Sequence, residues 1–366
     1  SAASDVYKRQ YQTKGQLALR HYVFNNGSSE YIGYAPSVMA NDQLTWETTD
    51  QWNVGVDFGF LKNRINGTVE FYLQNTKDLL LKRQLPVVSG FSSVMSNVGS
   101  TRNKGIEITL NTRNIMNRNF TWSTDLTFSA NKEEIVELYN GKTDDVGNLW
   151  FIGQPIDVYY NYKKIGIWQN TENDLAEMAK FNEKGANFKP GSIRLEDVDG
   201  DYKITEEDKQ ILGSVRPKFV ASMVNNFEFK GFDLSVFLYA SVGGLLRNNI
   251  EFMEKPGRGN TVKVDYWTPT NPTNAFPRPS VDVEKLDYIS TLGYDKADFL
   301  RIRNITLGYT LPEMWSKKVL MDKIRIYLSA NNPAIFTNFT GIDPEGANGR
   351  TAPSYSTWMF GINLSM

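Results

Sequence analysis

Residues 51–74, QWNVGVDFGFLKNRINGTVEFYLQ, decide the fold, because two alternating segments meet there at a short link, residues 61–63. In the first segment one face carries the apolar residues Trp52, Val54, Val56, Phe58 and Phe60. In the second segment one face carries Ile65, Gly67, Val69, Phe71 and Leu73. A strand turns successive side chains to opposite faces, so this stretch predicts an antiparallel hairpin with one apolar side.

The same alternation recurs along the chain, and with the hairpin it predicts ten strands. The other eight lie at residues 15–23, 104–113, 120–130, 218–229, 232–242, 299–311, 323–332 and 355–366. Short links at residues 61–63, 114–119, 230–231 and 312–322 alternate with long ones at residues 25–50, 75–103, 131–217, 243–298 and 333–354. A further apolar segment, residues 156–167, would break this up-and-down order, so we assign it to a long loop. Short turns at one end and long loops at the other are typical of outer-membrane barrels.

Composition excludes several classes of function. The 366 residues carry 40 basic and 41 acidic side chains, so no nucleic-acid partner is expected. There is no cysteine and a single histidine, His21, so thiolate or histidine metal clusters and Cys/His or Ser/His catalysis have no basis. No run approaches the roughly 18 apolar residues of a membrane helix. A glycoside hydrolase would need two convergent carboxylates, which the sequence does not nominate. We therefore expect no enzyme.

Alternation alone also fits a soluble sandwich, in which the apolar faces pack on each other. The corresponding function would be a secreted, calcium-braced carbohydrate-binding β protein. The asymmetry of the loops, and charged residues in mid-strand on the polar faces, favour a transmembrane barrel with a wet lumen instead.

Several blocks of sequence resemble the C-terminal half of the SusC/RagA-type TonB-dependent transporters. They are residues 41–81, residues 97–109 (NVGSTRNKGIEIT), residues 191–213 (GSIRLEDVDGDYKITEEDKQILG), residues 298–312 (DFLRIRNITLGYTLP) and residues 323–345. The resemblance implies import of glycans or peptides across the outer membrane of Bacteroidetes. It also implies a SusD-like surface lipoprotein as partner, and energy supplied through TonB.

The resemblance predicts the organisation of the chain as well. A family barrel has about 22 strands and a plugged lumen. The expectation is therefore an all-β, antiparallel, up-and-down transmembrane barrel segment of about ten strands. The remaining strands, the plug and the TonB-contacting segment would lie outside this chain. Residues 1–10 read as a foreign leader or assembly scar, and residues 11–366 as the C-terminal part of the barrel, with long extracellular loops at about 131–217 and 243–298. Family members usually end in an aromatic residue, whereas this chain ends in Met366.

One loop, residues 197–208 (DVDGDYKITEED), has the spacing of a calcium site. Carboxylates fall at positions 1, 3, 5 and 12 of a twelve-residue frame, and a backbone carbonyl falls at position 7. The predicted ligands are Asp197, Asp199, Asp201, Lys203, Thr205 and Asp208. Position 4 is Gly200, as in dockerins, but position 6 is Tyr202 where an EF-hand has glycine. The alternative is an Asp/Gly turn with solvated carboxylates.

Two other features lie in the predicted loops. The loop aromatics Trp150, Tyr159, Tyr160 and Trp168 could stack on sugar rings or pack the loop itself. Residues 340–345 (TGIDPE) read as a turn without chemistry.

Overall fold

The structure, a computed structural model, describes residues 14–24, 29–248, 264–280, 286–346 and 354–366. The predicted leader, residues 1–10, lies outside these ranges. The chain divides into two compact units. The first comprises Ser1–Gly55, Glu70–Ile106 and Asn131–Ile156, and the second comprises Val56–Val69, Glu107–Ala130 and Asp157–Met366. In the described ranges no helix has both the length and the apolar character needed to cross a membrane.

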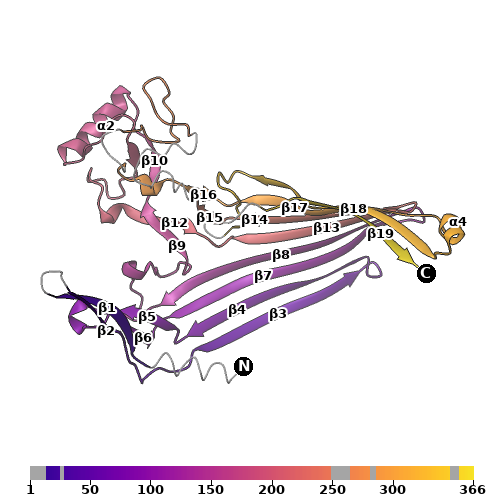
Figure 1. The fold of residues 1–366 in the computed structure, drawn as a ribbon, viewed down its shortest axis with the longest axis horizontal. Coiled ribbons are helices and arrows are strands. Elements are labelled where there is room, and N and C mark those ends of the chain that lie inside the picture. The colour runs from indigo at the N-terminus through magenta and orange to yellow at the C-terminus, as the bar shows by residue number, and fades with distance from the viewer. Residues whose placement is uncertain (1–13, 25–28, 249–263, 281–285, 347–353) are drawn as a thin grey trace. The chain divides into compact units, whose positions relative to one another are not determined.

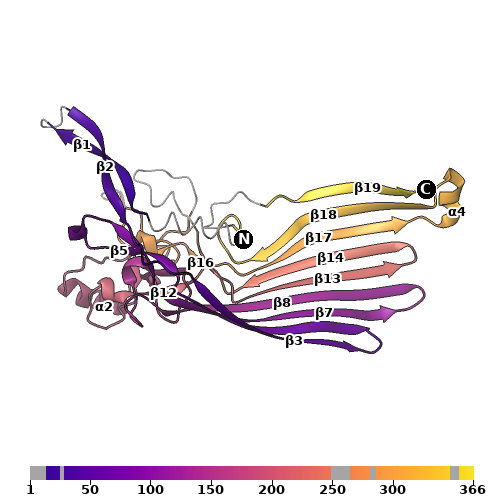
Figure 2. The same ribbon diagram turned by 90° about the horizontal axis from the view of Figure 1, so that it is seen from below.

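A nine-stranded sheet dominates the chain and follows the order of the sequence, β19-β18-β17-β14-β13-β8-β7-β4-β3 (Figures 1 and 2). Its strands are β3 (Thr48–Phe60), β4 (Ile65–Lys77), β7 (Ser100–Met116), β8 (Phe120–Glu137), β13 (Phe219–Phe229), β14 (Phe232–Val242), β17 (Phe299–Thr310), β18 (Lys323–Thr337) and β19 (Thr357–Ser365). The pairs from β8–β13 to β18–β19 are antiparallel. Edge strands β3 and β19 do not pair with each other, as in part of a larger barrel. The predicted fold class is confirmed.

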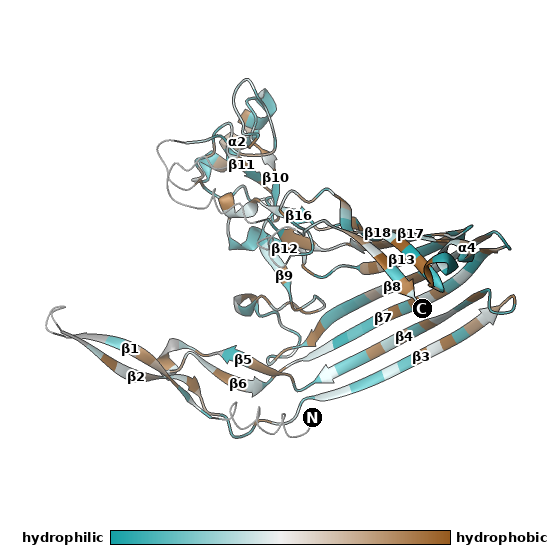
Figure 3. Cartoon of the chain, turned by 45° about the vertical axis from the view of Figure 1, so that its right-hand side comes forward, coloured by the Kyte–Doolittle hydropathy of each residue, from teal (hydrophilic) through white to brown (hydrophobic). Residues whose placement is uncertain are grey.

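The apolar stripe is largely exposed on the edge strands β3 and β19 and half-buried on most of the central strands. Cross-strand register keeps these side chains on one face, as in the row Phe227, Leu234, Leu307, Leu328 and Phe360. On the edge strands, exposure reaches 72% at Trp52, 60% at Val56 and 70% at Phe360. Figure 3 shows the resulting alternation of apolar and polar residues along the strands. A sandwich would bury these stripes against a second sheet, so the soluble alternative is wrong.

The predicted asymmetry of the connections is also observed. Strands β13 and β14 are joined by Lys230 and Gly231, whose φ angles of 47° and 89° match the left-handed backbone of a tight hairpin turn. The longest of the short links, between β17 and β18, holds helix α4 (Glu313–Ser316) and the 3-10 turn η6 (Lys317–Val319).

The first predicted strand does not belong to this sheet. Strand β1 (Gln16–Phe24) pairs instead with β2 (Ser29–Met39), in a four-stranded sheet of order β1-β2-β6-β5 with β5 (Leu80–Gln84) and β6 (Ser93–Asn97). Residues 25–50 and 75–103, expected as loops, therefore contain strands. Alternation identifies a strand but not its partner, and pairing with the next segment along the chain closes the shortest loop, which costs the least entropy.

The hydrophobic core of the second unit lies in its loops. Residues 156–167, predicted as part of a loop, form short strands there that pair outside the main sheet. The loop elements are β9 (Val158–Tyr162), β10 (Lys164–Ile167), α2 (Glu172–Glu183), β11 (Ile193–Leu195), η4 (Glu206–Asp208), β12 (Lys209–Ser214), β15 (Leu245–Arg247), η5 (Ile289–Thr291) and β16 (Tyr294–Lys296). The first unit adds η2 (Val87–Ser89) and η3 (Val146–Asn148). One buried cluster holds Ile167, Ile193, Leu195, Trp267, Ile289 and Leu292, and a second holds Trp168, Met178, Phe181 and Phe188.

Candidate calcium loop and polar surfaces

The carboxylates of the 197–208 loop fold its backbone. Asp197 accepts hydrogen bonds from the amides of Gly200 and Tyr202, each at 2.9 Å. The Asp199 carboxylate accepts from the Asp201 amide at 3.1 Å, and that of Asp201 accepts from the Lys203 amide at 2.7 Å. Such local bonds from aspartate to backbone stabilise tight turns in place of helix or sheet.

Asp208 closes the loop from its far end and is fully buried. One carboxylate oxygen accepts from the Val198 amide at 2.8 Å, and the other from the Thr205 amide at 2.7 Å. The second bond, with the Thr205 side chain, forms a capping box at the start of η4. Carboxylate oxygens of Asp197, Asp199 and Asp208 consequently lie within 4.8 Å of one another. Asp201 is exposed and lies outside this group.

Tyr202, the residue that departs from the EF-hand pattern, has the backbone that the pattern requires. Its φ is 62°, in the left-handed region that glycine at position 6 supplies in an EF-hand. The Tyr202 ring packs edge-on against Phe181 of α2 with centroids 5.4 Å apart, and its hydroxyl lies 3.2 Å from the Lys180 ammonium. Ile204 contacts both buried clusters. Three convergent carboxylates on an anchored loop suit a hard cation that prefers oxygen ligands, such as calcium.

Charges beside the loop are already paired. The Lys209 ammonium lies 2.6 Å from the Glu206 carboxylate, and its hydrogen bond lowers the pKa of Glu206. Burial and the negative charge of Glu206 raise the pKa of Tyr162. Glu206 therefore acts as the partner of Lys209 and is not one of the converging carboxylates.

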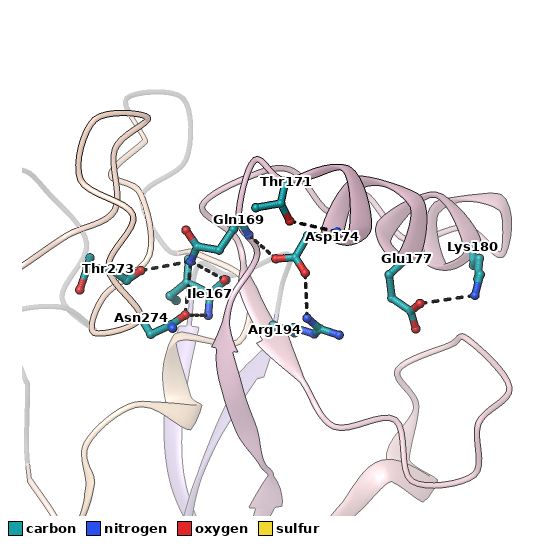
Figure 4. A network of polar contacts seen from close by, with 9 residues as sticks. All are labelled: Ile167, Gln169, Thr171, Asp174, Glu177, Lys180, Arg194, Thr273 and Asn274. Carbon is teal, nitrogen blue, oxygen red and sulfur yellow. Dashed lines mark hydrogen bonds and ion pairs between the residues drawn. The ribbon is translucent and has the colours of Figure 1, made fainter.

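A polar network fixes the start of α2 against neighbouring loop segments (Figure 4). Asp174 accepts from the Gln169 amide at 2.8 Å and from Arg194 of β11 at 3.0 Å. The Asn274 side chain accepts from the amide of Ile167 in β10 at 2.9 Å. The network joins α2, which the candidate loop contacts through Tyr202, to β11.

Two of the large loop aromatics, Trp168 and Tyr159, pack against other residues of the loops. Trp168 is buried among Phe181 and Phe188, with the Arg194 guanidinium 4.3 Å above its ring. Tyr159 packs edge-on against Tyr294. Buried in this way, Trp168 has no face left for a sugar.

The face of the main sheet opposite the apolar stripe carries linked polar side chains. The Asn304 amide donates to Asn331 at 2.7 Å and to the Ser329 hydroxyl at 3.0 Å. Thr306 and Ser329 hydroxyls are 2.8 Å apart. A face lined by such hydrogen-bonding groups is suited to contact with water or a polar solute.

A buried charge cluster joins two segments that the sequence analysis left without chemistry. Arg301 of β17 is 3% exposed, and its guanidinium lies 2.7 Å from Asp343 and 2.8 Å from Glu345. Glu345 also pairs with Arg303, and Asp343 accepts hydrogen bonds from Ser354. Residues 340–345 form a turn, as predicted, and the sequence did not indicate that two of its carboxylates would pair with Arg301. Arg301 and Arg303 lie two residues apart on β17 and both reach Glu345, but the carboxylates lie in a turn, where strand spacing gives no signal.

Comparisons with known proteins agree with this architecture. The family model described as "TonB dependent receptor-like, beta-barrel" matches residues 9–332. TonB-dependent receptor P3 of Formosa agariphila is 32% identical over 92% of this chain and 36% of its own length. TonB-dependent receptor SusC of Bacteroides thetaiotaomicron is 30% identical over 94% of this chain and 35% of its own. The solved RagAB peptide importer in the open-open state has a TM-score of 0.73 at 25% identity, covering 97% of this chain and 38% of that one. The chain thus spans about a third of these relatives.

Proposed function

Because the chain belongs to the TonB-dependent receptor β-barrel family, we propose that it forms part of an importer that carries glycans or oligopeptides across the bacterial outer membrane. The family is one of outer-membrane receptors and transporters, not enzymes. The observation that carries the proposal is the two-faced sheet: an exposed apolar stripe suited to lipid, opposite a hydrogen-bonded polar face suited to a wet lumen.

The proposed protein partners of the importer are inferred from the same relatives. SusC and the RagAB importer support a SusD-like surface lipoprotein as the partner of the complete protein, with TonB supplying energy. The long loops would then lie outside the cell, where such a lipoprotein can reach them. The substrate is either an oligosaccharide, as the sequence resemblance implies, or an oligopeptide, since one solved relative is titled a peptide importer.

Uptake by living cells tests the proposal. Cells that produce the full-length protein are compared with cells lacking it, using fluorescent oligosaccharides and fluorescent oligopeptides of matched size. We expect one class to enter faster in the producing cells, and a protonophore to abolish the difference. Equal entry of both classes into the two cell lines would refute import.

We also propose that the 197–208 loop binds calcium. Asp197, Asp199 and Asp208 would supply converging carboxylates, with Asp201, the Lys203 carbonyl and Thr205 as further oxygen donors. The ion would neutralise the clustered carboxylates and brace the loop against α2, because Tyr202 and Ile204 already connect the loop to the buried clusters. Its role is structural.

Calorimetric titration of the full-length protein with calcium tests this site. Affinity in the range of extracellular modules, about 10⁻⁴–10⁻³ M, is expected. Asp199→Ala should remove the binding heat. Glu207→Ala, an exposed carboxylate in the same loop outside the converging group, should retain it. No heat from the wild-type protein, or the same heat from Asp199→Ala, would exclude calcium.

A further inference from the structure

The apolar stripe of β3, β4, β7 and β8 ends before the strands do. Counting by twos from the apolar residues Trp52, Leu73, Ile106 and Ala130 toward the long-loop end leads to polar residues on the same face. These are Asp50, Asn75, Lys77, Lys104, Arg102, Lys132 and Glu134. Trp52 marks the boundary, a position where tryptophan is enriched at membrane–water interfaces.

Side-chain contacts join four of these polar residues on one face. Arg102 donates to the Asn75 side-chain oxygen at 3.0 Å across β7 and β4. The Arg102 guanidinium and the Lys132 ammonium each lie 3.5 Å from the Glu134 carboxylate on β8. Glu134 therefore holds two cations next to each other.

Positive charge predominates on this face. Lys77, Arg102, Lys104 and Lys132, here called the outer basic patch, stand against the carboxylates of Asp50 and Glu134. The three lysines are exposed, and the Arg102 side chain is 42% exposed. Four cations against two anions leave an excess of two positive charges just outside the apolar band.

The outer basic patch borders a hollow of about 250 Å³. It is lined by Asp50, Asn75, Lys77, Ser100, Thr101, Arg102 and Val136. The hollow is large enough to admit a phosphate group. The hydroxyls of Ser100 and Thr101 add neutral donors beside the cations of Lys77 and Arg102.

We propose that the outer basic patch binds the phosphate-bearing head group of a lipid in the outer leaflet. Arginine and lysine are the common ligands of phosphate, and basic side chains next to a membrane attract anionic head groups. Acyl chains of the same lipid would lie against the adjoining apolar stripe at Trp52 and Leu73, which commits the patch to a lipid and not to free phosphate. The inference depends on the membrane placement in the proposed function. It does not depend on the transported substrate, which passes on the opposite face of the sheet.

Native mass spectrometry of the full-length protein in neutral detergent tests the proposal. The probe is lipid A, a phosphorylated glucosamine lipid, compared with its enzymatically dephosphorylated form. The test variant is Lys77→Gln/Lys104→Gln/Lys132→Gln. Each basic side chain near an anionic surface contributes about fivefold in affinity, so the triple variant should bind lipid A roughly 100-fold more weakly. The dephosphorylated lipid should bind the wild-type protein and the variant equally.

The matched control is Lys62→Gln/Lys230→Gln/Lys318→Gln, which removes the same charge at the short-turn end of the strands. It should bind lipid A within twofold of the wild-type protein. Equal loss in both triple variants, or no loss in the test variant, overturns the proposal. Displacement of the lipid by 10-fold molar excess of inorganic phosphate would also overturn it, because the ligand would then be phosphate alone. Labelled-substrate uptake should be unchanged in the test variant, which separates this result from a failure of the import proposal.

Discussion

Replacing Arg301 with methionine should detach residues 343–345 from β17. The guanidinium is almost fully buried and contacts the carboxylates of Asp343 and Glu345 at 2.7 and 2.8 Å. Methionine fills much of the same space but supplies no positive charge. Asp343, itself 6% exposed, would be left as a buried carboxylate without its cation.

The magnitude follows from that burial. Breaking a buried ion pair by removing one partner costs about 3–5 kcal/mol, because the remaining charge stays desolvated. At about 1.4 kcal/mol per tenfold change in an equilibrium constant, local opening should become more frequent by two to nearly four orders of magnitude. Arg325→Met is the matched control. Its ion pair with Asp233 is partly exposed, with side-chain exposures of 22% and 33%, so its loss should cost at most about 1 kcal/mol.

Amide hydrogen exchange of the full-length protein measures the difference. The Glu345 amide donates to Asp343, so its exchange reports opening of this contact directly. We expect a rise of at least 100-fold in Arg301→Met and of less than about fivefold at the same amide in Arg325→Met. Similar exchange in the two variants would show that burial of the Arg301 cluster contributes nothing to holding this loop.

Three further results are expected. Val56→Arg, in the middle of the exposed stripe of β3, should cost about 2–4 kcal/mol of unfolding free energy in lipid; a cost below about 0.5 kcal/mol, normal for a water-exposed site, would contradict lipid contact. Gly67→Ala should destabilise the barrel by about 1–3 kcal/mol, because the new methyl group would press on the backbone carbonyl of Thr109. The control Gly55→Ala meets only a flexible glutamate side chain and should cost less. The temperature at which each variant loses its folded-barrel mobility in gel electrophoresis compares the two. Burial raises the pKa of Asp343, but its hydrogen bonds and the nearby arginine together hold it below the ordinary value of 3.8. The contribution of Asp343 to stability should therefore be complete above about pH 5 and lost as pH falls through the lowered pKa. Denaturant titrations at several pH values should show a weaker dependence of the unfolding free energy on pH in Asp343→Asn than in the wild-type protein.

Local sequence pattern was enough to locate most strands of the main sheet and to assign their faces. Period-two alternation is a local property, so residues 51–74 define a one-sided hairpin without reference to any distant residue. The lengths of the links between strands then ordered the strands, because a short link joins only neighbours. Several blocks of sequence, among them residues 97–109 and 298–312, indicated the family by resemblance. The twelve-residue spacing of residues 197–208 identified the loop in which three carboxylates converge.

Which segments pair with one another became known only from the folded structure. Strand β1 has the same alternation as the barrel strands, yet it pairs with β2, since a pattern of faces carries no information about a partner. Arg301 and Asp343 lie 42 residues apart, and their pairing depends on how the segment after β18 folds back onto β17. The outer basic patch is likewise assembled from β4, β7 and β8 by strand register. In each case the stabilising contact joins two separate segments, and the local pattern of either segment does not encode its partner.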